Sequence, residues 1–188
     1  MGVGLDGEEQ ANTDGAATES LLIITGTMGA GKTSVLGEAS DLLALRHIAH
    51  AAIDLDALGL AYLPSTASHN GVMYRNLQSI CKNYATIGVT RFLVARAIED
   101  RAELELCRSA VSASNAIVCR LAATIETMQQ RVKMRETGVS QTEYVARVAN
   151  LNRTLDAAQL EDFIVTSEGR SVTEVAQEVL VKAKWMSE

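Results

Sequence analysis

Short apolar runs recur along the chain and alternate with longer stretches in which the apolar residues have helical spacing. The runs predict strands at residues 21–25, 48–53, 90–95, 115–121 and 163–166. The other stretches predict helices at residues 32–46, 72–86, 99–110, 124–136, 140–155 and 171–184. Short apolar strands joined by helical crossovers are typical of a parallel sheet with helices on both faces. The pattern therefore predicts a three-layer α/β fold.

Two of the predicted helices begin with recognisable N-terminal signals. Ser140 and Glu143 have the spacing of a capping box, and Ser171 is a typical N-cap residue for the last helix. In a parallel sheet covered by helices, ligands bind beyond the carboxyl ends of the strands. The residues that follow each predicted strand are therefore the first candidates for a functional site.

The chain has 188 residues, which suits one domain, and its charge is unevenly spread. The formal net charge is −6, and five acidic residues but no Lys or Arg fall within residues 1–19. This acidic segment has little apolar surface to offset the entropy of ordering, so we expect a disordered tail at 1–19 and a folded domain at 20–188. The domain is then close to neutral, which argues against nucleic acid as a partner.

The cysteines and the hydropathy pattern favour a cytoplasmic protein. Cys81, Cys107 and Cys119 match no zinc or redox spacing, and we interpret them as core residues in a reducing compartment. The N-terminal segment lacks the apolar stretch of a signal peptide, and no run approaches the ~20 apolar residues that span a bilayer. We expect no association with a membrane.

The strongest motif lies between the first strand and the first helix. Residues 26–33 fit the phosphate-loop pattern G-x-x-x-x-G-K-[ST] at every fixed position. Glycines let the backbone N–H groups surround an anion, and the following helix presents its N-terminus to the same anion. The motif predicts binding of a nucleoside triphosphate, with Lys32 at the β- and γ-phosphates and Thr33 on Mg²⁺. The predicted nucleotide contacts here are Gly26, Thr27, Met28, Gly29, Ala30, Gly31, Lys32, Thr33 and Ser34.

Two carboxylates follow the second predicted strand. If the extended backbone continues past this strand, the side chains of Asp54 and Asp56 lean to one side, facing the phosphate loop. One could order water on Mg²⁺, for which Asp54 is the candidate, and the other could accept a proton from an attacking hydroxyl. Which of the two is the base stays open. Alternatively, they cap a short helix beginning at 57–58, and Asp56 alone could be that cap.

A polar, arginine-bearing segment follows the fourth predicted strand. Arg131 and Arg135 are four residues apart and share one face of a helix, and Arg147 and Arg153 lie on the next helix. We interpret residues 124–153 as a lid whose arginines neutralise charge on the transferring phosphoryl group and exclude water. The alternative is an ordinary solvated helix surface.

Further arginines are candidates for substrate or base contacts. Arg75 and Arg96 could contact a substrate or form structural ion pairs, and Arg120 could face the nucleotide base. The turn at 167–170 follows the fifth strand, and Gly169 and Arg170 are candidates for the edge of the adenine.

Taken together, the motif at 26–33, the D-x-D at 54–56, the Arg131-x-x-x-Arg135 segment and the turn at 167–171 resemble the small P-loop kinases. This is the nucleoside-monophosphate-kinase-like superfamily, which includes adenylylsulfate, shikimate, gluconate and antibiotic phosphotransferases. The resemblance covers residues 20–184. It implies a five-stranded parallel sheet in the order 2-3-1-4-5, a helical lid, and transfer from Mg-ATP to a small molecule. The chain has Leu55 where adenylylsulfate and gluconate kinases usually carry glycine, which argues against those two substrates.

We therefore expect an ATP- and Mg²⁺-dependent kinase, a monomer or homodimer, that phosphorylates a hydroxyl of a small, uncharged or weakly charged molecule. The alternative is a regulatory ATPase acting on a protein partner. Such proteins generally carry an acid at the end of an apolar strand, and the third strand ends at Arg96 without one.

Overall fold

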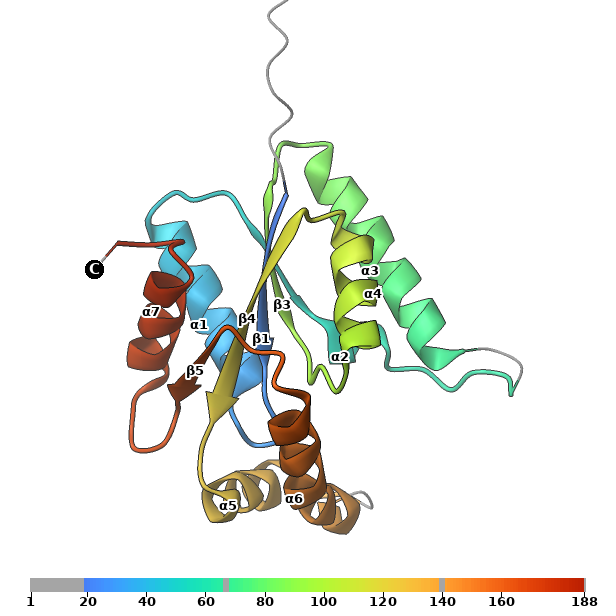
Figure 1. The fold of residues 1–188 in the computed structure, drawn as a ribbon, viewed down its shortest axis with the longest axis vertical. Coiled ribbons are helices and arrows are strands. Elements are labelled where there is room, and N and C mark those ends of the chain that lie inside the picture. Colours follow the sequence, from blue (N-terminus) through green and yellow to red (C-terminus); the bar gives the residue numbers. More distant parts are fainter. Residues whose placement is uncertain (1–18, 66–67, 139–140, 188) are drawn as a thin grey trace, which may run out of the picture.

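Five parallel strands form one sheet in the computed structural model, which describes residues 19–65, 68–138 and 141–187 (Figure 1). The strand order is β2-β3-β1-β4-β5, which confirms the predicted α/β class and the 2-3-1-4-5 sheet. The strands are β1 (Ser20–Thr25), β2 (Ala51–Asp54), β3 (Arg91–Ala95), β4 (Asn115–Ala122) and β5 (Phe163–Thr166).

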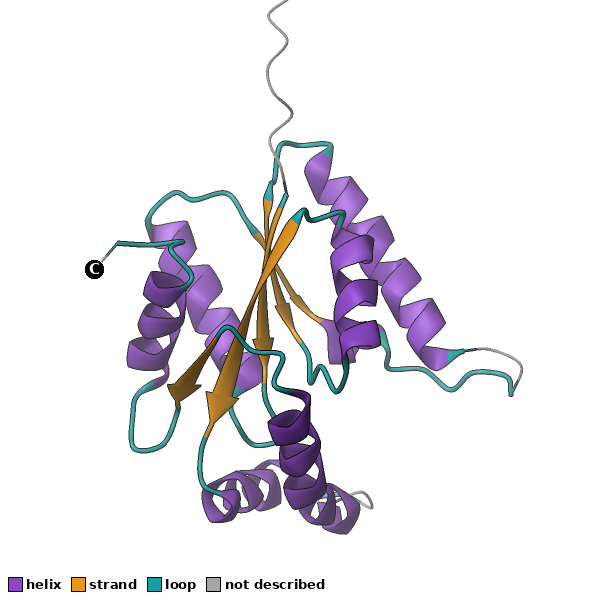
Figure 2. Cartoon of the chain, viewed as in Figure 1, coloured by secondary structure: helices purple, strands orange, loops and turns teal. Residues whose placement is uncertain are grey.

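Helices cover both faces of the sheet, and further helices lie beyond the carboxyl ends of its strands (Figures 1 and 2). Helices α1 and α7 pack together on one face, and α3 and α4 pack together on the other. Helices α5 and α6 lie beyond the carboxyl ends of β4 and β5. The helices are α1 (Lys32–Leu45), α2 (Leu55–Leu58), α3 (His69–Ala85), α4 (Arg101–Val111), α5 (Ile125–Arg135), α6 (Gln141–Ala158) and α7 (Val172–Lys182).

The central strand β1 divides the core into two halves. Leu22 and Ile24 point into a cluster built with α1 and α7, whereas Leu21 and Ile23 point into a cluster built with α3 and α4. Alternate residues of a strand face opposite sides of a sheet, so a continuous apolar run is what a strand buried on both faces requires. Burial on both faces fixes the position of β1 in the sheet, and with it the point at which the following loop begins.

The second strand begins later than predicted, at Ala51 instead of residue 48. His47 has a left-handed φ of 55°, and the Ile48 backbone N–H bonds the carbonyl oxygen of Leu43. The ring of His50 then contacts the carbonyl oxygen of Ile48 at 2.8 Å. These hydrogen bonds hold residues 47–50 in a turn after α1, so the strand begins only after them. The apolar run at 48–53 did not reveal them.

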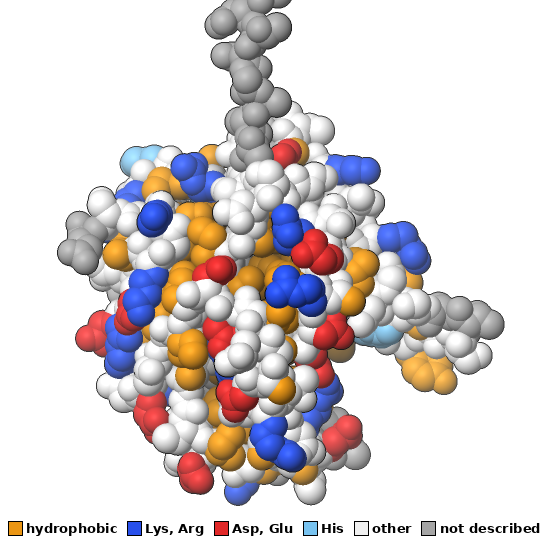
Figure 3. Space-filling model, in the orientation of Figure 1, with side chains coloured by type: hydrophobic (Ala, Val, Ile, Leu, Met, Phe, Trp, Pro, Cys, Tyr) orange, Lys and Arg blue, Asp and Glu red, His pale blue; other side chains and the backbone are white. Residues whose placement is uncertain are grey.

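Several other expectations can be compared with the structure. Ser171 caps α7 in a full capping box with Glu174, and Cys81, Cys107 and Cys119 are buried and free, as expected of core residues. Most of the acidic tail at 1–19, and Ser140 of the predicted capping box, lie outside the described residues. None of the described helices has the length and apolar character needed to span a membrane. On the face shown in Figure 3, acidic and basic side chains are interspersed over the described surface.

Candidate active site

The phosphate loop joins β1 to α1 in a conformation that depends on glycine. Gly29 has a φ of 80°, and a Cβ built there would lie 2.3 Å from the carbonyl oxygen of Met128 on α5. Gly31 is the N-cap of α1 in the left-handed region, with a φ of 103°, and no side chain caps the helix. The N–H groups in the first turn of α1 therefore remain available to an anion, together with the positive end of the helix dipole.

Lys32 lies between the loop and the acidic residues that follow β2. Its Nζ donates a hydrogen bond to the carbonyl oxygen of Thr27 at 3.3 Å, which holds the side chain back along the loop. Burial lowers the pKa of Lys32, while the carboxylates of Asp56 and Asp54 raise it in part. A bound phosphate would supply the negative charge that this partly desolvated ammonium lacks.

Thr33 and Asp54 form the pair that could hold Mg²⁺. The hydroxyl of Thr33 donates to Oδ2 of Asp54 at 2.7 Å, across 21 positions of sequence. A hydroxyl and a carboxylate oxygen are donors that Mg²⁺ takes, together with phosphate and water. In the described part of the chain, no cluster of three or more His, Cys, Asp or Glu could hold a metal on its own. The donor set thus fits a magnesium ion shared with a phosphate.

Asp56 belongs to a different network, centred on Arg96. Nη1 of Arg96 contacts Oδ1 of Asp56 at 2.5 Å, and its Nε contacts Oε1 of Glu103 at 3.0 Å. The side chain of Glu103 is only 9% exposed and also accepts hydrogen bonds from the Tyr74 hydroxyl and the Glu99 backbone N–H. Burial lowers the pKa of Arg96, but the carboxylates of Glu103 and Asp56 together raise it by more, which keeps the guanidinium charged. A buried, fully bonded carboxylate therefore anchors the arginine that holds Asp56.

The two aspartates do not extend from one strand face, contrary to the sequence-based premise. Asp54 is the last residue of β2 and the N-cap of α2, where its Oδ1 accepts the backbone N–H of Asp56 at 3.1 Å. The cap is thus Asp54, not Asp56. Asp56 lies in the first turn of α2, and the helical turn points it at Arg96 while Asp54 faces Thr33. The start of α2 between them therefore gives the two carboxylates different partners.

A small hollow of about 160 Å³ lies beside the loop, on the side of α7. Its walls include Gly31 and Ser34 of the loop and first helical turn, Arg131 of α5, and Ser167 and Arg170 after β5. Gly169 forms the turn between the last two, with a φ of 68°. Arg170 also bonds Glu178 at 2.5 Å. Of the residues predicted at the nucleotide base, Gly169 and Arg170 thus lie in the turn beside this hollow, and Arg120 does not line it.

Arg131 links this hollow to the loop. Its Nη1 donates to the carbonyl oxygen of Gly29 at 3.2 Å and to the hydroxyl of Ser167 at 2.9 Å, and its Nη2 donates to the Ser167 carbonyl oxygen at 3.0 Å. Glu168, in the same turn, accepts hydrogen bonds from Thr124 and Thr127 at the start of α5, and these bonds lower the pKa of Glu168. The turn after β5 is therefore fastened to α5.

A larger cavity of about 530 Å³ opens on the other side of Lys32. Asp56 and Arg96 form part of its wall, and α5 and α6 contribute Arg135 and Arg147. Arg135 contacts Glu136 at 2.8 Å, and Arg147 contacts Glu99 at 3.1 Å. This cavity is lined by Met28 and Lys32, and the smaller hollow by Ala30 and Gly31, so both border the phosphate loop.

Two predicted residues lie elsewhere. Arg120 is 6% exposed and contacts Asp156 at 2.6 Å and Glu161 at 3.5 Å, so its guanidinium joins β4 to the end of α6. Its donors are taken by these partners, which favours a structural role over contact with a base. Arg75 is exposed on α3 and is not part of the cavity wall.

Residues that the sequence did not single out complete the site. Glu99 and Glu103 pair with Arg147 and Arg96 in the wall of the larger cavity, and Tyr144 of α6 also lines it. Asp100 and Glu103 have the spacing of a helix start, and Asp100 does cap α4. That signal locates Glu103 on the first turn but does not reveal its contact with Arg96.

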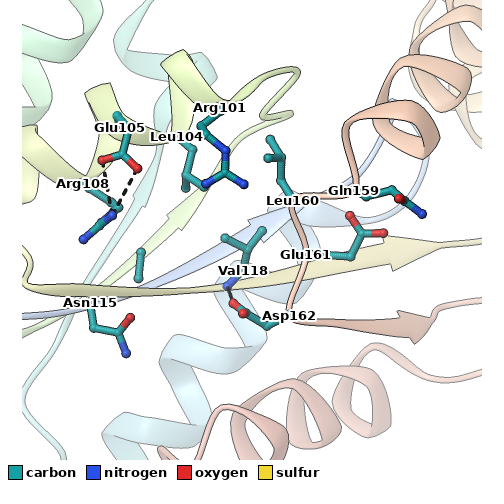
Figure 4. A pocket seen from close by; sticks show the side chains of 11 residues that line it. Arg101, Leu104, Glu105, Arg108, Asn115, Val118, Gln159, Leu160, Glu161 and Asp162 are labelled. Carbon is teal, nitrogen blue, oxygen red and sulfur yellow. Dashed lines mark hydrogen bonds and ion pairs between the residues drawn. The ribbon is translucent and has the colours of Figure 1, made fainter.

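Another hollow, of about 350 Å³, lies away from the phosphate loop (Figure 4). It lies between α4, the first half of β4 and the segment that leads into β5, where Arg101, Arg108 and Asp162 are among its walls. None of the predicted site residues lines it.

Comparisons with known proteins point to one group of folds. No protein-family model matches the chain, and no curated protein matches it in sequence. A sugar kinase from a Janibacter species matches with a TM-score of 0.61 at 15% identity, covering 89% of this chain and 95% of that chain. The APS kinase of Mycobacterium tuberculosis, solved with AMPPNP and APS, matches with a TM-score of 0.59 at 18% identity, covering 89% and 98%. A shikimate kinase from Acinetobacter baumannii, solved with shikimate, matches with a TM-score of 0.55 at 19% identity, covering 90% and 95%.

At these identities, the likeness concerns the fold. It confirms that the chain resembles the small P-loop kinases in architecture, over nearly the full length of each match. The similar structures are phosphotransferases that act on different acceptors, so the fold alone does not name an acceptor.

Proposed function

We propose that this protein is an ATP-dependent kinase that transfers the γ-phosphoryl group of ATP to a hydroxyl group of a small molecule. The observation that carries the proposal is that the two aspartates after β2 have different partners. Asp54 bonds the Thr33 hydroxyl at 2.7 Å on the phosphate-loop side, whereas Asp56 is held by Arg96 in the wall of a separate cavity. Lys32 lies between them and lines that cavity.

In this reaction, the acceptor hydroxyl lies in the cavity next to Asp56. The Asp56 carboxylate accepts the proton of the hydroxyl while the oxygen attacks the γ-phosphorus, and the bond from that phosphorus to the bridging oxygen breaks, releasing ADP. Lys32 stabilises the charge that spreads over the phosphoryl oxygens. Thr33 and Asp54 would hold Mg²⁺, which would supply positive charge to the phosphates.

The nucleotide lies with its phosphates on residues 26–33 and its base in the hollow between Arg131 and Arg170. Arg131 and Arg135 stabilise phosphate charge, and residues 124–153 act as a lid over both sides of the loop. Support comes from the place of α5 and α6 beyond the carboxyl ends of the strands and from the arginines that they contribute to the two cavities.

Phosphoryl transfer from ATP to a panel of alcohols, compared between the parent protein and Lys32→Ala, tests the proposal. Loss of transfer in this variant is expected, by about a thousandfold or more, because one preorganised charge at the transferring group is removed. Lys82→Ala, an exposed lysine on α3, serves as the matched control and keeps the parent rate. A Lys32→Ala protein that transfers phosphate at the parent rate contradicts the mechanism.

The same assay separates the kinase from a regulatory ATPase. A kinase consumes ATP only when an acceptor is present, whereas a switch protein hydrolyses ATP by itself. β3, which pairs with β1, ends at Ala95 and is followed by Arg96, so the acid that such proteins place there is absent from this described position. Hydrolysis that no alcohol accelerates would favour the ATPase.

A further inference from the structure

The larger cavity, in which the acceptor lies in the proposed mechanism, also indicates what kind of molecule the acceptor is. It lies between Lys32 and Asp56 on one side and α3, α5 and α6 on the other, with a volume of about 530 Å³. That is within the range of pockets that enclose small organic molecules. Its wall can therefore be examined for the charge and polarity that a ligand would meet.

The arginines that face the acceptor are already paired with carboxylates. Arg96 is held by Asp56 and by the buried Glu103, at 2.5 and 3.0 Å. Arg147 is held by Glu99 at 3.1 Å, in a contact that joins α6 to the segment before α4. A ligand carboxylate or phosphate would have to displace one of these partners, and at Arg96 it would leave a buried carboxylate without its counter-charge.

The charges nearest the phosphate loop act on the phosphates in the proposed mechanism. Arg135 is close enough to Lys32 to lower its pKa, so these two cations act together on the phosphate side. They are committed to the transferred group in the proposed mechanism. Arg135 is also paired, with Glu136 at 2.8 Å, so each arginine in the described wall of this cavity has a carboxylate partner.

The remaining wall combines the polar side chains of His69 and Glu136 with a group of apolar ones. Met28 of the phosphate loop, Met73 of α3 and Leu151 of α6 line the cavity, and Tyr144 adds a ring with a polar end. Leu60, after α2, also lines it and is 91% exposed. Methionine side chains adapt to irregular apolar ligands, and covering an exposed leucine with a ligand is favourable.

We propose that the acceptor is an uncharged alcohol whose hydroxyl is carried on a largely apolar body. This inference rests on the proposed kinase activity and adds the class of substrate to it. The product is then a monophosphate ester of a neutral alcohol, formed together with ADP, and the proton that Asp56 accepts passes to solvent. Acceptors that bear a carboxylate or a phosphate are poor substrates because the paired arginines offer them no free charge.

Matched pairs of alcohols test the proposal directly. The neutral members are benzyl alcohol, cyclohexylmethanol and adenosine, and the anionic members are hydroxymethylbenzoate, hydroxymethylcyclohexanecarboxylate and adenosine monophosphate. Glycerol and glucose represent neutral alcohols without an apolar body. With labelled ATP and Mg²⁺, the expected kcat/KM of a neutral apolar alcohol exceeds that of its anionic partner by about tenfold or more, the size of one unfavourable charged contact.

Two variants test whether the Glu99–Arg147 pair causes the preference for neutral acceptors. Glu99→Gln removes the partner of Arg147 in an exposed ion pair, so the anionic members gain about two- to fivefold relative to the neutral ones. Glu105→Gln makes the same chemical change on the exposed side of α4, where Glu105 contacts Arg108, and leaves the ratio unchanged. A Glu99→Gln protein with the parent ratio shows that the pair does not govern charge selection and overturns the inference.

The outcomes separate the two proposals. Preference for the anionic members, or equal use of glycerol, glucose and the apolar alcohols, overturns the substrate class and leaves the kinase intact. Transfer to other members of the panel, with none to a neutral apolar alcohol, has the same meaning. Binding of Mg-ATP with no transfer to any alcohol counts against the kinase itself. Failure to bind a fluorescent ATP analogue at all removes the proposed function itself.

Discussion

Lys32 is the residue on which the charge of the candidate site depends most. It combines a partly desolvated ammonium with two nearby carboxylates, and burial has the larger effect on its pKa. Desolvation disfavours the charged form of a lysine, whereas opposite charges favour it. In the proposed function, a bound triphosphate would bring further negative charge to the same place, so binding of the nucleotide and protonation of Lys32 would support each other.

Affinity for the nucleotide is therefore expected to fall at alkaline pH. The lowered pKa of Lys32 means that it loses its proton below the ordinary lysine range, and the neutral amine no longer attracts the phosphates. The Kd for Mg-ATP, measured by titration calorimetry from about pH 7 to 10, should rise by about tenfold or more. Lys32→Arg cannot lose its charge in this range, and its profile should be flat even if its binding is weaker. A flat profile for the parent protein would refute the prediction.

At the scale of elements, the phosphate loop and α5 are built against each other. The backbone of Met128 lies where a side chain at position 29 would have to go. This contact joins the first loop of the chain to a helix that begins about a hundred positions later. Glycine in the phosphate-loop motif thus has two roles here, one toward an anion and one toward a packed helix.

Gly29→Ala is expected to destabilise the protein by about 2–4 kcal/mol, from a left-handed backbone and a clash with backbone atoms that cannot rotate away. Gly37→Ala is the matched control, because Gly37 lies inside α1 and a Cβ there meets no atom within 4 Å. It should stabilise the protein by about 0.5–1 kcal/mol. Denaturant unfolding measures both changes. Equal stability of the Gly29→Ala and parent proteins would show that the loop and α5 are not packed as described.

The start of α4 is the second such junction. Glu103 lies on its first turn and fixes Arg96, which in turn fixes Asp56 after β2. The contacts of Arg96 with Asp56 and Glu103 therefore connect the segments that follow β2 and β3, next to the larger cavity. Its position makes Glu103 a positioning residue, since it does not line the cavity itself.

Glu103→Gln should lower kcat for the alcohol acceptor by about tenfold while changing the KM for ATP by less than about twofold, because it loosens Asp56 and leaves the nucleotide side intact. Steady-state kinetics with each substrate varied in turn distinguish these effects. Glu105→Gln, on the same helix, should behave like the parent protein. A Glu103→Gln protein that loses nucleotide and acceptor affinity together would indicate general damage instead of lost positioning.

At the scale of the whole molecule, local sequence determined most of the architecture. The five apolar runs and the phosphate-loop pattern lie in contiguous segments, so their periodicity predicted the sheet and the loop. Contacts between distant segments could not be predicted in this way. Arg96 bonds Asp56 across 40 positions, and Arg131 bonds Gly29 across 102. Arg120 was expected at the nucleotide because the sequence does not reveal which partners lie beside a strand.

Arg131 donates to the carbonyl oxygen of Gly29 and to both oxygens of Ser167, so one guanidinium spans the phosphate end and the base end of the proposed nucleotide groove. The two ends of the groove then cannot open independently of each other. Replacement of spent ADP by fresh ATP would require this side chain to release both ends, which makes nucleotide exchange a step that could limit turnover even when the chemistry is fast.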